Sequence, residues 1–246
     1  MPEKIRLNKY IASCGLGSRR TADELITSGV VEVNDKRINE LGVSVTKKDS
    51  VKVKGKIIRP EQKTYIAFNK PPGYITSTED EKGRKTIYDI LPEKIKILKT
   101  AGRLDKDSTG LLVMTNDGEL IQELTHPTKQ VPKVYLVTAK GLVKNRDLVK
   151  FNEGIEIEKG KIAYAEAVII DCQNSDTTLQ ITLYQGYNRQ IRRMFDKVGH
   201  PVISLKRTSH ACVELSGLER GKFRYISPKQ VQELKNYLKK REFGSN

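Results

Sequence analysis

The stretch GRLDKDSTGLLVMTNDGEL, Gly102 to Leu120, contains an acid whose position needs an explanation. Asp105 follows Arg103 and precedes a Thr-Gly pair and an apolar run. A single carboxylate held in a pocket can act as a nucleophile or as a general base. Taken alone, however, an aspartate in a polar loop is more often structural or solvated. Two other acids, Asp107 and Asp117, compete for such a role, and Asp117 fits the start of the next helix better.

A basic segment, GYNRQIRRMF, could supply the cation that keeps a buried carboxylate ionised. Its pattern predicts an amphipathic helix whose apolar side chains face the core. Helical spacing would place Arg189 and Arg192 on one face and Arg193 about 100° away. The spacing leaves the choice among the three arginines open, and a basic surface helix is the alternative.

Two further arginines, Arg19 and Arg20, fall in the first turn of a predicted helix, where the helix dipole disfavours positive charge. A phosphate would compensate, because it could bind both guanidinium groups and the free N–H groups of that turn. Lys9 and Lys36 would help if they share this face. A solvated basic face is the alternative.

Histidine and cysteine spacing favours neither a metal site nor a disulfide framework. The three histidines are far apart and lack a supporting cysteine or carboxylate pattern. The three cysteines are few, odd in number and distant, so we expect reduced, buried thiols. The sequence therefore predicts no metal.

The chain is strongly basic, with 45 Lys and Arg against 30 Asp and Glu and a formal net charge of +15. This excess predicts a polyanionic partner. No apolar run approaches the ~20 residues of a spanning helix, and no hydrophobic signal segment follows Met1. We therefore expect a cytoplasmic protein with no membrane partner.

Two domains are expected, residues 1–60 and 61–246. The first shows two helix-like segments, the second capped by Ser18, and then three short strands. It carries about twice the charge density of the remainder. The segment 59–64 has a proline and no large apolar residue, which favours a linker.

Beyond the linker, many short strands mix with few helices, which favours an α+β fold. Asn116 is expected to cap one helix, Ser227-Pro228 begins a terminal one, and NRQIRRMFDKVG predicts another. The expected strands are YIAFN, GLLVMT, KVYLVTA, AYAEAVII, TLQITLY and HACVEL.

Two resemblances extend this interpretation. The segment RLNKYIASCGLGSRRTADELITSGVVEVND resembles the S4 RNA-binding domain, which binds structured RNA, chiefly ribosomal. NKPPGYITS, GRLDKDSTGLLVMTNDGEL, KVYLV and GYNRQIRRMF resemble, in order, the successive motifs of the RsuA family of pseudouridine synthases. The likeness spans nearly the whole chain, and it implies a second domain with a mixed, mainly antiparallel sheet flanked by helices.

The family resemblance also implies residue roles. Asp105 would be the catalytic carboxylate and Arg192 its ion-pair partner, with Tyr135 packing against the target base. Arg103 would fill the space that the flipped uridine vacates, or contact a phosphate. The remaining expected RNA-side residues are Arg189, Arg193 and Lys70, the last as support for the catalytic loop, together with Arg19, Arg20 and Lys9 of the S4 module.

The reaction that the family resemblance implies moves the ribose bond of uridine from a ring nitrogen to a ring carbon, and it needs no cofactor. The expected substrate is ribosomal RNA, 23S rather than 16S, and the expected state is a monomer. Two alternatives remain: a non-catalytic S4-domain RNA-binding or ribosome-assembly factor, and a base-excising glycosylase. Retention of both Asp105 and Arg192 argues against an inactive relative.

Overall fold

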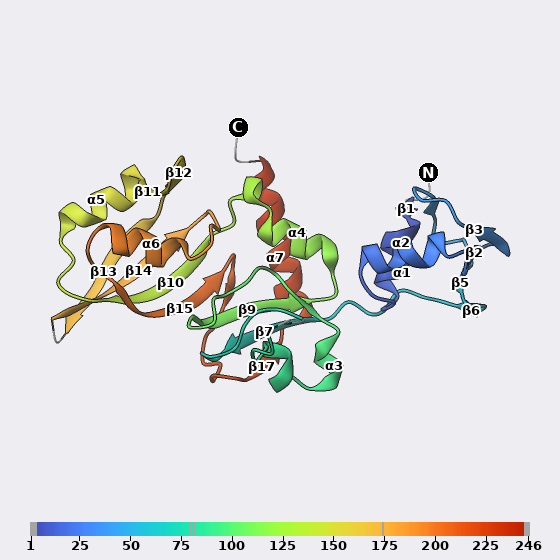
Figure 1. The fold of residues 1–246 in the computed structure, drawn as a ribbon, viewed down its shortest axis with the longest axis horizontal. Helices are drawn as coiled ribbons and strands as arrows, with labels where there is room; N and C mark the ends of the chain where they lie inside the picture. The colour runs from blue at the N-terminus through green and yellow to red at the C-terminus, as the bar shows by residue number, and fades with distance from the viewer. Residues whose placement is uncertain (1–3, 79, 81, 174, 244–246) are drawn as a thin grey trace. The chain divides into compact units, whose positions relative to one another are not determined.

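The computed structural model describes residues 4–78, 80, 82–173 and 175–243, and the chain divides into two compact units, residues 1–63 and 64–246 (Figure 1). The division falls within the segment 59–64. In the described ranges, no helix is long and apolar enough to cross a membrane.

The first unit packs two helices, α1 (Leu7–Ser13) and α2 (Arg19–Thr27), against short strands. The Ser18 hydroxyl caps α2 by accepting the Thr21 N–H at 3.1 Å, as the sequence predicts. Leu7 and Ile11 of α1 are fully buried in this unit's own core. The strands are β1 (Ile5–Arg6), β2 (Val31–Val33), β3 (Lys36–Ile38), β4 (Ser44–Val45), β5 (Val51–Val53) and β6 (Lys56–Ile57).

The second unit is built on a sheet that has nine strands among the described residues, in the order β13-β14-β10-β15-β9-β7-β17 with β8 and β16 attached. Only β15 and β9 pair in parallel in this described sheet, so the prediction of an α+β fold with a mainly antiparallel sheet is confirmed. Its strands are β7 (Tyr65–Lys70), β8 (Lys99–Thr100), β9 (Thr109–Thr115), β10 (Lys133–Ala139), β13 (Glu166–Gln173), β14 (Asp176–Leu183), β15 (Val202–His210), β16 (Val213–Glu214) and β17 (Phe223–Tyr225).

Apolar side chains on both faces of β9 explain its unbroken hydrophobic run. Leu112 packs into a core that also contains Phe195, whereas Leu111 and Val113 pack into a second core with Leu124. The first core also holds η1 (Ile87–Ile90), α3 (Glu93–Lys96), α5 (Asn145–Glu153), α6 (Gln190–Lys197) and the hairpin β11 (Ile155–Glu158) and β12 (Lys161–Ala163). Helices α4 (Gly118–Thr125) and α7 (Pro228–Phe243) cover the other face, beyond which η2 (Pro127–Lys129) follows α4 (Figure 1).

Several local predictions are wrong. Asp117, not Asn116, is the N-cap residue of α4, because the Asn116 side chain accepts the Thr64 N–H at 2.8 Å instead. The predicted strand HACVEL is broken after β15 by a turn in which Ala211 has a φ of 53°. Cys172 and Cys212 are exposed free thiols rather than buried ones. The sequence reasoning missed β3, β15 and α5, and also short elements such as β1, β8, β11, β17 and α3.

Candidate active site

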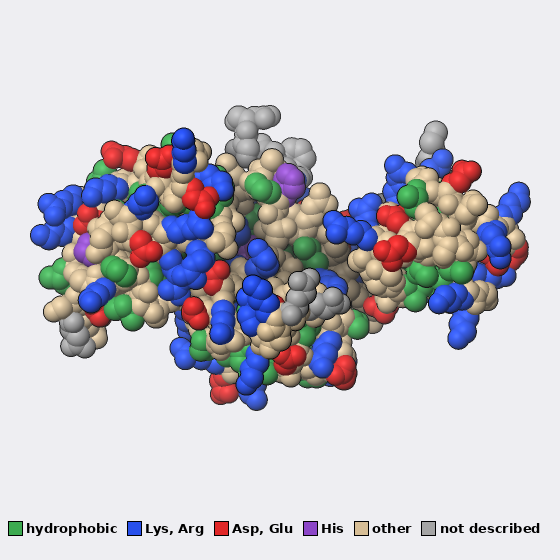
Figure 2. Space-filling view, in the orientation of Figure 1, with side chains coloured by type: hydrophobic (Ala, Val, Ile, Leu, Met, Phe, Trp, Pro, Cys, Tyr) green, Lys and Arg blue, Asp and Glu red, His purple; other side chains and the backbone are tan. Residues whose placement is uncertain are grey.

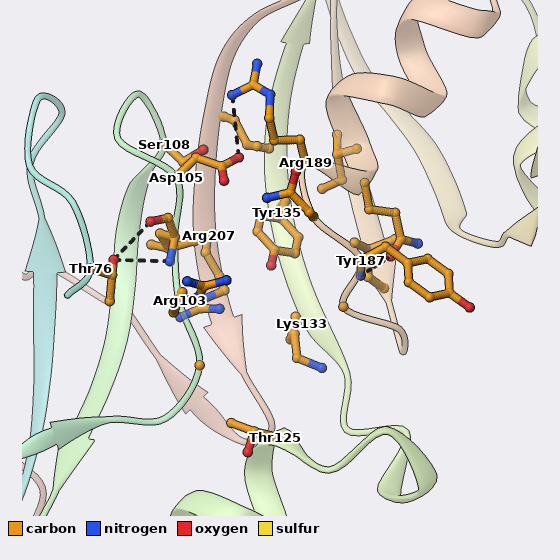
Figure 3. Close-up of a pocket in the computed structure, with 18 of the residues that line it drawn as sticks. Thr76, Arg103, Asp105, Ser108, Thr125, Lys133, Tyr135, Tyr187, Arg189 and Arg207 are labelled. Carbon is orange, nitrogen blue, oxygen red and sulfur yellow. Dashed lines mark hydrogen bonds and ion pairs between the residues drawn. The ribbon is translucent and has the colours of Figure 1, made fainter. Parts of the chain in front are cut away.

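An open cavity of about 1020 Å³ lies on the sheet of the second unit (Figure 3). It is at the upper end of the range for ligand pockets, roughly 300–1,000 Å³. The loop 101–108 between β8 and β9 forms one side, and the connection 184–189 before α6 forms another. Arg103, Asp105 and Tyr135 all line it, so the cavity brings together residues from two separate sequence motifs.

Lys70 holds the loop that carries Asp105. Its ammonium group donates hydrogen bonds to the carbonyl oxygens of Pro71 (3.1 Å), Lys106 (3.1 Å) and Ser108 (2.8 Å). The side chain is fully buried, and burial lowers the pKa of Lys70 to about 8, an effect that the nearby carboxylates of Asp107 and Asp105 oppose. Lys70 therefore fixes the main chain on the C-terminal side of Asp105.

Thr76 fixes the other side of this loop. Its hydroxyl donates to the Leu104 carbonyl at 2.9 Å and accepts the Leu104 N–H at 3.2 Å. The Ser108 N–H donates to the Asp105 carbonyl at 3.1 Å, which closes a turn. The carboxylate thus extends from a backbone that is hydrogen-bonded both before and after it.

Gly110 allows the loop to join the centre of the sheet. It has a φ of 102°, and a Cβ atom there would overlap the backbone of Arg207, its partner in the parallel β9–β15 pairing. A side chain at this position is therefore excluded both by space and by backbone conformation.

Arg189 is the arginine that lies against Asp105. Its Nη1 atom is 3.9 Å from Asp105 Oδ2, and the two side chains are 45% and 28% exposed. Arg189 is the N-cap residue of α6 and has a left-handed backbone, φ 50°. The buried Gln190 fixes this connection, because its side chain accepts the Tyr187 N–H at 3.1 Å and donates to Gln185 at 3.3 Å.

The other two arginines of this segment have different partners. Arg192 Nη1 donates to the Val202 carbonyl at 3.2 Å, and Arg193 forms an ion pair with Glu158 at 2.6 Å. Neither lines the cavity. The geometry therefore differs from the predicted Asp105–Arg192 pair, and within the described chain Arg189 is the ion-pair partner of Asp105.

Lys70 lies where a support for the Asp105 loop was expected, but its burial differs from its assignment among the RNA-side residues. Because it is fully buried and occupied by three carbonyl oxygens, it acts on the loop and offers no surface to RNA. In the first unit, Arg19 and Arg20 are exposed in the first turn of α2, whereas Lys9 is half-buried on α1. Lysine and arginine side chains are spread over the visible faces of both units (Figure 2).

The sequence reasoning missed several basic residues of the cavity, among them Arg207 on β15 and Lys133 on β10. Lys133 precedes Tyr135 by two positions in a predicted strand. Strand alternation places both side chains on the same face, so the sequence could have indicated that Lys133 lies in the cavity. Arg207 had no such signal, because its strand was not predicted. Among the described residues, no group of three or more His, Cys, Asp or Glu side chains is placed to hold a metal ion.

Comparison with known proteins agrees with this architecture. The RNA pseudouridylate synthase family matches residues 64–197, and the S4 domain matches residues 5–61. Ribosomal large subunit pseudouridine synthase B of Bacillus subtilis (strain 168) is 41% identical over 232 residues, which are 94% of this chain and 95% of the relative. An uncharacterized RNA pseudouridine synthase of Aquifex aeolicus (strain VF5) is 36% identical over 233 residues, 94% of each chain.

A solved structure gives the same result. A crystal structure of a pseudouridylate synthase superposes with a TM-score of 0.68 at 29% identity, and the match covers 94% of this chain and 99% of that one. The matches to the S4 domain and to pseudouridine synthases place the chain in the class of RNA-modifying isomerases. The chain belongs to the RNA pseudouridylate synthase family, in the form that carries an N-terminal S4 domain.

Proposed function

We propose that this protein is a site-specific pseudouridine synthase of ribosomal RNA, and that its substrate is the 23S rather than the 16S molecule. The name of the Bacillus subtilis relative, a ribosomal large subunit synthase, supports the choice of RNA. The net charge of +15 supports a polyanionic substrate. We expect the protein to act as a monomer in the cytoplasm, without a cofactor.

One observation supports the catalytic assignment above the others: the Asp105 carboxylate projects into the cavity from a loop that is hydrogen-bonded on both sides. The reaction breaks the bond from the ribose C1′ to N1 of uracil and forms a bond from C1′ to C5. The proton on C5 must leave, and N1 gains one, so no external reactant enters the balance. One ionised carboxylate can serve such a rearrangement as nucleophile or base.

The other groups of the cavity have supporting roles in this proposal. Tyr135 packs against the uracil, and Arg103 occupies the space left in the RNA when the uridine turns outward. Arg189 supplies the cation beside Asp105 in the RNA-bound site, a role that the family resemblance gives to Arg192. The S4 module docks on the RNA through Arg19 and Arg20, with Lys9 as a further contact.

The test compares the wild type with Asp105→Asn on unmodified ribosomal RNA, followed by mapping of pseudouridine. Asp107→Asn is the matched control, since it removes the exposed neighbouring carboxylate of the same loop. We expect one modified position or a few adjacent ones with the wild type and with the control, and none with Asp105→Asn. The same position should lack pseudouridine in cells without the gene.

Other outcomes separate the alternatives. Binding without pseudouridine from the wild type would indicate an RNA-binding or assembly factor, whereas release of free uracil would indicate a glycosylase. Undiminished activity of Asp105→Asn would contradict the role of Asp105. Modification of 16S RNA alone would contradict the proposed substrate.

A further inference from the structure

Three basic side chains enter the cavity at the end away from the Asp105 carboxylate: Arg103, Arg207 and Lys133 (Figure 3). Arg207 and Lys133 belong to the adjacent strands β15 and β10, in which Arg207 pairs with Tyr135 and Lys133 with His210. None of the three forms an ion pair with a carboxylate of the described chain. This end of the cavity therefore carries positive charge that the described protein does not neutralise.

Arg207 is the least satisfied of these groups. It is 2% exposed, and its Nε atom donates to the Leu111 carbonyl at 2.7 Å. Its Nη2 atom is buried and has no hydrogen-bond partner in the structure. A buried cation without a compensating charge is costly, so a purely structural arginine would be expected to have a full set of acceptors.

Lys133 adds a second charge to the same place. Its ammonium group is half-buried and donates to the Val131 carbonyl at 2.8 Å. Burial and the positive charge of Arg207 lower the pKa of Lys133 to about 8. The same causes, burial first, hold the pKa of the fully buried His210 well below its usual range. The charges of Lys133 and Arg207 therefore repel one another in the free protein.

We propose that Lys133 and Arg207 form a binding site for a phosphodiester group of the RNA strand that enters the cavity. The inference rests on the proposed function, which supplies RNA as the ligand. A phosphate brings negative charge close to both cations and an acceptor oxygen to the accessible Lys133. Lys133 makes the accessible contact, and Arg207 contributes its unneutralised charge from the cavity wall.

Such a site has a clear purpose in base flipping. The target uridine must leave its stack before its glycosidic bond can meet Asp105. A phosphate held at the opposite end of the cavity fixes the backbone beside the target nucleotide while the base turns inward. The site thus positions the strand and takes no part in the exchange of bonds.

The test uses Lys133→Gln, which removes the accessible charge and leaves the Arg207–Leu111 hydrogen bond in place. Lys206→Gln is the matched control. Lys206 directly precedes Arg207 on β15, but it lines a separate pocket. The probes are a short oligouridylate with phosphodiester linkages and the same oligomer with neutral methylphosphonate linkages.

We expect Lys133→Gln to bind the phosphodiester probe about tenfold more weakly than the wild type, with a salt dependence lower by about 0.7 in slope. It should bind the neutral probe as the wild type does. Its melting temperature should rise, since a repulsive buried charge is gone. Lys206→Gln should keep the preference for the charged probe.

Two results would overturn the proposal: equal probe preference in Lys133→Gln and the wild type, or a lower melting temperature with unchanged affinity, which indicates a structural lysine. Pseudouridine formation on ribosomal RNA is measured separately with the wild type. If the wild type forms no pseudouridine but its preference for the charged probe still depends on Lys133, the proposed function is contradicted and the phosphate site is supported.

Discussion

Arg189 Nη1 and Asp105 Oδ2 lie 3.9 Å apart, and the backbones that carry them are both fixed before RNA arrives. Asp105 is held through the carbonyl contacts of Lys70, and Arg189 through the side chain of Gln190 that locks the preceding turn. Because both side chains are partly exposed, the pair contributes little to the stability of the free protein. We expect the attraction between the two charges to become stronger when a bound nucleotide excludes water from the site.

This geometry predicts different outcomes for two neighbouring arginines. Arg189→Ala should lower kcat about tenfold or more and leave the melting temperature unchanged, because it removes the partner of Asp105. Arg192→Ala should mainly lower stability, by about 1 kcal/mol, because it removes the hydrogen bond to the Val202 carbonyl. Single-turnover kinetics and urea denaturation measure the two effects. A loss of kcat confined to Arg192→Ala would instead favour the arginine that the family resemblance indicates.

Lys70→Met should damage catalysis through the loop. The substitution leaves three carbonyl oxygens without their donor, at a cost of about 1–3 kcal/mol for each that stays buried and unsatisfied, offset by the removal of a buried charge. We expect a lower kcat, an unchanged KM and faster hydrogen exchange at Ser108. Lys106→Met, at an exposed side chain of the same loop, is the control and should change none of these. A changed KM with normal exchange would indicate an RNA contact instead.

Gly110→Ala should destabilise the whole second unit. The added methyl group meets the Arg207 backbone in a conformation that alanine rarely adopts, and overpacking alone costs about 1–3 kcal/mol. Gly118→Ala is the control, since a Cβ atom there meets nothing within 4 Å at the start of α4. Equal urea midpoints for the two variants would contradict the close approach of β9 and β15.

The pKa of Lys133 predicts how stability changes with pH. It is about 8 in the folded protein and 10.5 ordinarily, so the unfolded chain binds more protons between these values. The contribution of Lys133 to the unfolding free energy is therefore a penalty below pH 8 that disappears as the pH rises toward 10.5. The stability advantage of Lys133→Gln over the wild type should shrink across this window in urea denaturation. An advantage that is constant with pH would contradict the shifted pKa.

Strands with a clear pattern were predictable. The alternation of KVYLVTA gives β10 with its bounds, and the apolar run GLLVMT gives β9 to within one residue. By contrast, β15 has the sequence VISLKRTSH, whose charged and hydroxyl side chains resemble a loop. It is a strand because β10 and β9 pair with it on both sides, which no local pattern records. Arg207 could not be found for the same reason.

The sequence motifs predicted which segments form the site, but they did not predict which arginine forms the ion pair with Asp105. Asp105 and Tyr135 do line one cavity. The assumption that Arg189 and Arg192 share a helical face fails, because α6 begins at Gln190 and Arg189 precedes it with a left-handed backbone. The burial of Lys70 likewise depends on which carbonyl oxygens the fold brings to it, and a sequence motif does not show this.

The parallel pairing of β15 with β9 is short, and it joins only Lys206 to Thr109 and Arg207 to Gly110. Asp105 lies on the cavity wall formed by the loop that leads into β9. Tyr135 lies on the opposite wall, on β10, and β15 separates β10 from β9 in the sheet. A slip of one residue at this junction would displace the walls by about 3.3 Å and reverse the faces of β15. The alignment of Asp105 with Tyr135 therefore depends on the register of two residue pairs between β15 and β9.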